Sequence, residues 1–186
     1  MKPFIFGSCL LLSAFIWGAC NNSNSTSQDP VDSAKAVNKA VKPVEKDASD
    51  FAVKAADGGM MEVALGRIAQ EKASSQRVRD FGAMMVKDHT EANENLKHIA
   101  VALQVALPDS VGDDTKKEID KLAKKNGKDF DKSYMDMMVE DHEKDVAEFR
   151  KAADKCSDST IKSFAAVTLP TLEKHLDSAR AITGKK

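Results

Sequence analysis

Cysteine is nearly absent from this chain of 186 residues, which contains three: Cys9, Cys20 and Cys156. Cys9 lies inside an N-terminal apolar segment and Cys20 at its end, so one thiol is left for the remainder of the chain. A single thiol forms no internal disulfide, which excludes a fold held together by a disulfide framework. We expect Cys156 to be a partly covered residue at a helix end.

The chain also has little of what β-sheets and nucleic-acid binding require. It contains one Trp and one Tyr, and aromatic residues make up 5% of it. Such a composition, with abundant Ala, Lys, Glu and Asp, favours helices over strands. The 28 Lys and Arg are balanced by 29 Asp and Glu, for a formal net charge of −1. Nucleic acid is therefore not an expected partner, because binding it needs a concentrated basic surface.

A long apolar run occurs only at the N-terminus. Residues 4–19 are apolar or small, but a membrane-spanning helix needs about 20 such residues. The run follows Lys2 and ends in Gly18-Ala19-Cys20, which resembles a bacterial lipoprotein signal peptide over residues 1–20. In that interpretation Cys20 carries lipid and becomes the new N-terminus. An ordinary cleaved signal and an uncleaved anchor are the alternatives.

Residues 21–49 are predicted to be a disordered polar tether between that anchor and a folded domain. Residues 21–28 contain no core-forming side chain, and Pro43 would stop any transient helix over residues 34–41. A tether of about 30 residues reaches roughly 30 Å. The predicted partner is thus a membrane, through an N-terminal lipid anchor. Asn22, where an Asp would retain a lipoprotein in the inner membrane by the best-known sorting rule, favours an exported protein in the outer membrane.

Apolar residues recur at helical spacing from residue 50 onward. They predict helices over about 50–73, 75–106, 129–153 and 158–182, with a short helix inside the link over residues 107–127. Short links make the first two helices antiparallel, and likewise the last two. Two hairpins joined by one long crossover are the connectivity of ferritin-like bundles. The predicted fold is therefore all-α, a ferritin-like four-helix bundle over residues 50–183, with an up-down bundle carrying a decorated loop as the alternative.

One motif occurs twice. Residues 81–89 and 134–142 share the pattern aromatic-x-x-Met-Met-Val-x-Asp-His, which suggests related halves or one site built twice. His89 and His142 both fall on the predicted core face, where an unpartnered polar group is costly. Glu62 and His175 lie near the core faces of the other two helices. The sequence therefore predicts a polar cluster in the middle of the bundle.

Two interpretations of this cluster remain open. In the first, a buried hydrogen-bond network fixes the helix register, and Met85 and Met138 fill the core. Its members would be Glu62, Asp88, His89, Asp141, His142 and His175. In the second, the Glu and the three His bind a single transition-metal ion. Imidazole and carboxylate ligands suit zinc, iron or manganese, and Met85 and Met138 as soft ligands would add copper.

Residues 50–182 resemble a bacterial family catalogued as domain of unknown function 4142, whose members are often labelled outer-membrane or secreted proteins. The resemblance rests on Glu62-Val63 and Leu65-Gly66, on the two Asp-His pairs at residues 88–89 and 141–142, and on Leu169-Pro170 with His175-Leu176. It implies a bundle related to the ferritin-like superfamily, and it implies no established activity.

The chain departs from di-iron ferritins at the residues that matter for iron. Those sites use Glu-x-x-His on two helices, whereas positions 86, 139 and 172, three before each core histidine, hold Val, Val and Leu. A di-iron site is therefore not expected, and no catalytic residue is predicted. The first functional hypothesis is an envelope-anchored, non-enzymatic binding or stress-related module. The alternative is a protein that binds iron, copper or zinc through its core His and Glu.

Overall fold

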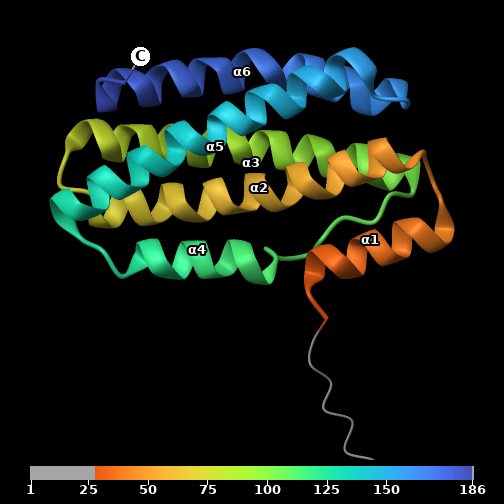
Figure 1. The fold of residues 1–186 in the computed structure, drawn as a ribbon, viewed down its shortest axis with the longest axis horizontal. Helices are drawn as coiled ribbons and strands as arrows, with labels where there is room; N and C mark the ends of the chain where they lie inside the picture. Colours follow the sequence, from red (N-terminus) through yellow and green to blue (C-terminus); the bar gives the residue numbers. More distant parts are fainter. Residues whose placement is uncertain (1–27, 186) are drawn as a thin grey trace, which may run out of the picture.

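The computed structural model describes residues 28–185, which form six helices and no strand (Figure 1). The all-α prediction is confirmed. In chain order the helices are α1 Pro30–Val41, α2 Lys46–Lys72, α3 Gln76–Leu103, α4 Asp113–Ala123, α5 Gly127–Lys155 and α6 Ser159–Thr183.

Four long helices form the bundle as two hairpins, α2 with α3 and α5 with α6. Side-chain carboxylates join the hairpins at both ends. Asp131, in the first turns of α5, accepts hydrogen bonds from the backbone N–H groups of Ser74 and Ser75 at 2.9 Å, where α2 turns into α3. At the other end, Asp47 of α2 accepts from the N–H of Ser157 at 3.0 Å, between α5 and α6. Helices α2 and α5 are therefore antiparallel.

The connection from α3 to α5 runs back along the length of the bundle and contains α4, which lies beside α2 (Figure 1). Asp57 of α2 holds it there by accepting from the N–H of Gly112 at 2.8 Å and from the hydroxyl of Thr115 at 2.7 Å. The predicted four-helix bundle with a long crossover and a short helix within it is confirmed.

The predicted disordered tether is wrong for residues 30–49. Residues 30–41 form α1, and α2 begins at Lys46 rather than near Asp50. The side-chain amide of Asn38 donates to the carbonyl of Ala106 at 2.9 Å and accepts from its N–H at 2.7 Å, which docks α1 on the crossover. A partner 68 residues away cannot be inferred from local composition. Residues 21–27 of the tether and Cys20, the predicted lipidation site, lie outside the described residues.

Two smaller observations complete the fold. Cys156 is partly buried and ends α5, as expected. Among residues 28–185 no helix is long and apolar enough to cross a membrane.

Candidate functional site

Four polar side chains meet in the middle of the bundle, one from each long helix. Glu62 comes from α2, His89 from α3, His142 from α5 and His175 from α6. All four are at most 5% exposed, and they are surrounded by the hydrophobic core. The structure thus brings together the four residues that the sequence analysis selected as metal ligands. Asp88 joins them from the α3 surface, where it is partly exposed.

Each imidazole uses one ring nitrogen to contact an oxygen of the protein. Nδ1 of His89 lies 2.8 Å from Oε2 of Glu62. Nδ1 of His142 lies 2.9 Å from the carbonyl oxygen of Met138, one helical turn earlier. Nε2 of His175 lies 2.9 Å from Oδ2 of Asp88. Because carbonyl and carboxylate oxygens accept hydrogen bonds, these three nitrogens carry the ring protons.

The opposite nitrogens are therefore unprotonated: Nε2 of His89, Nε2 of His142 and Nδ1 of His175. Nε2 of His142 and Nδ1 of His175 are 3.3 Å apart. A hydrogen bond between them would require one ring to give up its contact with Met138 or Asp88. Nε2 of His89 is buried and has no hydrogen-bond partner. The cluster therefore holds several lone pairs at close range with no proton between them.

The spacing of the rings matches that of a metal centre. The three ring centroids are 5.2, 5.3 and 5.7 Å apart, and one nitrogen of each ring lies within 4.8 Å of one nitrogen of both others. Three imidazoles bound tetrahedrally at a Zn–N distance of about 2.05 Å would have centroids about 5.2 Å apart. To share one ion, the nitrogens would have to lie about 3.3 Å from one another, as those of His142 and His175 already do.

Glu62 supplies the fourth potential ligand atom. Its Oε1 lies 3.4 Å from Nε2 of His142, is buried, and has no hydrogen-bond partner. The edge of a tetrahedron around a metal with bonds of about 2.05 Å measures about 3.3 Å. The separations Oε1–Nε2 and Nε2–Nδ1, at 3.4 and 3.3 Å, agree with that edge.

The electrostatics of the cluster favour neutral imidazoles. Burial lowers the pKa of His89, His142 and His175 to about 4 in each case, so each ring is uncharged at neutral pH, which is the form that binds metal. Burial raises the pKa of Glu62 to about 7, against the opposing effect of His142. Partial burial acts to raise the pKa of Asp88, but the hydrogen bond from His175 and the charges of His175 and Lys87 together outweigh it, so the pKa lies below its usual value.

The other predicted residues lie around the cluster. Met85 and Met138 are fully buried in the core, and Met138 takes part through its backbone carbonyl. Asp141 is half-buried, 3.7 Å from Lys144, with its Oδ2 unpartnered, and burial raises its pKa to about 6. The two Asp-His pairs thus differ, because Asp88 orients a histidine of another helix whereas Asp141 faces Lys144.

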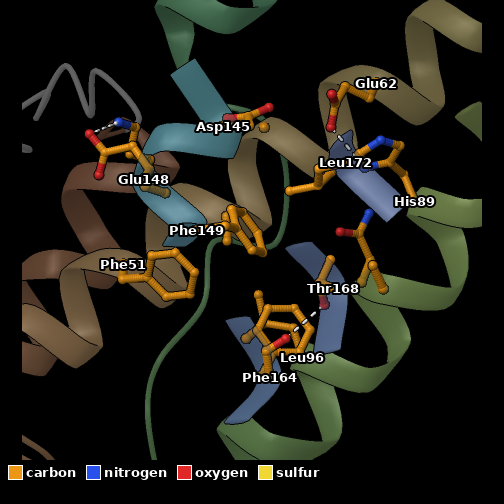
Figure 2. Close-up of a pocket in the computed structure, with 16 residues that line it drawn as sticks. Phe51, Glu62, His89, Leu96, Asp145, Glu148, Phe149, Phe164, Thr168 and Leu172 are labelled. Carbon is orange, nitrogen blue, oxygen red and sulfur yellow. Dashed lines mark hydrogen bonds and ion pairs between the residues drawn. The ribbon is translucent and has the colours of Figure 1, made fainter. Parts of the chain in front are cut away.

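The sequence analysis missed one residue, Asp145. It lies three residues after His142 on α5 and lines a cavity of ≈ 30 Å³ together with Glu62 and His89 (Figure 2). Burial and the neighbouring Glu62 raise the pKa of Asp145 to about 8. The spacing His142-x-x-Asp145, which places both side chains on one helix face, could have identified it.

Residues 33–182 match the family described as Domain of unknown function (DUF4142), and the chain belongs to that family. No curated protein matches it. Among solved structures, it is similar to a crystal structure from Streptomyces coelicolor, described as a secreted DUF305 protein. That likeness covers 76% of this chain and 98% of the other, with 19% identity and a TM-score of 0.62, which shows a shared fold.

Proposed function

We propose that this protein is an exported metal-binding protein that holds one transition-metal ion with Glu62, His89, His142 and His175. The observation that carries the proposal is the direction of the three imidazoles. Each has one N–H fixed by a protein oxygen, and their unprotonated nitrogens are left inside the cluster. Metal-binding histidines are oriented in this way by carboxylates and carbonyls around them.

Three imidazoles and one carboxylate suit Zn²⁺, Cu²⁺ or Fe²⁺. A site with four protein ligands is closed, whereas catalytic metal sites keep a position for water or substrate. The proposed activity is therefore binding rather than catalysis, in agreement with the absence of any predicted catalytic residue. Because Glu-x-x-His is lacking on the helices that supply the histidines, we propose one ion and not a di-iron pair.

The buried-network interpretation makes a different prediction for the same residues. A protonated Glu62 could donate from Oε1 toward Nε2 of His142, 3.4 Å away, and no ion would be needed. Its pKa of about 7 makes the proton available. Metal content separates the two interpretations.

The test is elemental analysis of the protein after equilibration with Zn²⁺, Cu²⁺ or Fe²⁺ and removal of free metal. We expect one equivalent in the wild type and a loss of at least tenfold in His142→Gln. The matched control is His98→Gln, because His98 is the remaining histidine of the chain and is exposed. Wild-type protein that retains less than a tenth of an equivalent of every metal would establish the hydrogen-bond network instead.

We also propose that the protein is a lipoprotein held in the outer membrane through Cys20. The signal-like residues 1–20 support this, and the description of the Streptomyces coelicolor protein as secreted supports the export alone. Cell fractionation tests it: the wild type should label with palmitate and sediment with outer membranes, and Cys20→Ser should do neither. Equal membrane recovery of both would contradict the anchor.

A further inference from the structure

Three carboxylates lie at increasing depth along one cavity. Glu148, whose side chain is 44% exposed, lines its outer part, where it pairs with Lys54 at 3.1 Å. Asp145 is half-buried one helical turn before it on α5. Glu62 is 2% exposed and lies at the metal centre. Figure 2 shows Glu62, His89 and Asp145 gathered at one end of the cavity, with Phe51 and Phe164 at the other.

The inner end of the cavity presents ligand atoms that have no partner. His89, which lines it, is 5% exposed, and its Nε2 makes no hydrogen bond. Oε1 of Glu62 is also unpartnered. The side of the cluster at Asp88, which does not line the cavity, differs, because there His175 directs an N–H toward Asp88. A cation arriving from the Asp88 side would meet a ring proton, whereas one arriving through the cavity would meet lone pairs.

The backbone of α2 keeps this space open. Gly58 and Gly59 both line the cavity, and a side chain at Gly59 would collide with the amide of Asn93 on α3. The enclosed volume of ≈ 30 Å³ suffices for about one water molecule or a partly dehydrated ion. A path of this width admits a cation only if polar groups replace its hydration water.

We propose that this cavity is the route by which the metal ion reaches the histidine cluster, and that Asp145 is the residue that receives it on the way. The inference rests on the proposed function, since it assigns a path to the same site. Glu148 attracts the cation at the surface, and Asp145 releases its proton to water as its carboxylate replaces water around the cation. The ion then passes to Glu62 and the histidines. Lys54 opposes its entrance by its charge and by pairing with Glu148.

Stopped-flow uptake of Co²⁺ by the full chain, purified in detergent, tests the route through the visible bands of a histidine-bound Co²⁺ ion. We expect Asp145→Asn to slow association and dissociation alike, each at least tenfold, because a residue that acts only on the path leaves the equilibrium affinity unchanged. Asp141→Asn is the matched control, because Asp141 is half-buried one turn away on α5 but does not line the cavity. It should change association less than twofold. Lys54→Ala, at a position where the side chain is 60% exposed, should accelerate association two- to fivefold.

The outcomes separate the route from the site itself. Absence of Co²⁺ uptake by the wild type would overturn the metal centre and the route with it. If the wild type takes up Co²⁺, but Asp145→Asn, Asp141→Asn and Lys54→Ala do so at the same rate, the route alone is overturned. Faster dissociation from Asp145→Asn with unchanged association would make Asp145 a permanent ligand and also overturn its role in transit. Circular dichroism of each variant confirms that the rates refer to folded protein.

Discussion

Gly66 of α2 and Gly82 of α3 meet back to back where the two helices cross. A Cβ at Gly66 would lie 2.6 Å from the carbonyl oxygen of Gly82, and a Cβ at Gly82 would lie 2.7 Å from the carbonyl oxygen of Gly66. Gly66 lies four residues after Glu62 on α2, and Gly82 lies seven residues before His89 on α3. The contact between the two glycines therefore sets the helix separation at which the side chains of Glu62 and His89 can touch.

We expect Gly82→Ala to destabilise the fold by about 1–3 kcal/mol, because backbone atoms must move to admit the methyl group. Gly58→Ala is the control, since a Cβ there meets nothing within 4 Å. In a helix interior that substitution should stabilise by about 0.5–1 kcal/mol. Urea unfolding of both variants measures the difference. Two substitutions of the same sign would contradict the close approach.

A second prediction concerns the docking of α1. Asn38 is 5% exposed and makes both of its amide hydrogen bonds to Ala106. Replacing it by Ala leaves the backbone groups of Ala106 without those partners, at about 1–3 kcal/mol for each group that stays buried. Hydrogen exchange should then rise over residues 30–41 and not over α3. Lys39→Ala, at the exposed neighbouring position, should leave exchange unchanged. Unchanged protection in Asn38→Ala would show that other contacts hold α1.

A third prediction concerns Asp88, which contacts His175 and which we do not expect to bind the metal itself. Asp88→Asn should weaken metal binding about 10–100-fold, because it loosens the orientation of the ring without removing a ligand. Asp80→Asn, at an exposed position on α3, is the control. Competition with a chromophoric chelator measures both affinities. An unchanged affinity in Asp88→Asn would mean that packing alone orients His175.

The helices and their connectivity could be predicted because each long helix repeats apolar residues at helical spacing over many turns. The central cluster could be predicted for the same reason, since Glu62, His89, His142 and His175 interrupt apolar faces that must be buried. Two short links and one long link then left few arrangements. Local pattern and loop length were sufficient for these conclusions.

The docking of α1 could not be predicted in this way. The spacing of His142 and Asp145 could place Asp145 on the same helix face as His142, but it could not give its role. Residues 30–49 combine Lys, Ala and Val with two prolines, and the pairing of Asn38 with the distant Ala106 helps to dock them. The two Asp-His pairs look equivalent in sequence, yet Asp88 contacts His175 whereas Asp141 lies nearest Lys144. The proposed role of Asp145 depends on a cavity that four helices form together. Each of these features depends on which distant element faces the residue.

The last prediction concerns stability against pH in metal-free protein. Burial raises the pKa of Asp145 to about 8, so between its ordinary value of 3.8 and pH 8 the folded state keeps a proton that the unfolded state has released. Stability therefore falls as pH rises through that window. The three core histidines make stability depend on pH in the opposite direction. Their pKa is about 4 in the folded state, so stability falls as pH drops below about 6.5. Between pH 6.5 and 8 the buried carboxyls alone decide the slope.

Asp145→Asn cannot titrate, so it should lose less stability than the wild type between pH 6.5 and 8. At about 1.4 kcal/mol for each pH unit the difference is at most about 2 kcal/mol. Solvent reaches part of the carboxyl and makes the difference smaller. Because Glu62 has a pKa of about 7, the stability of the variant should still fall somewhat as pH rises. Thermal unfolding with a chelator present measures this, and Asp177→Asn, at an exposed position of α6, should follow the wild type. Parallel curves for wild type and Asp145→Asn would mean that the Asp145 carboxyl is ionised in the folded protein and that its pKa lies below this window.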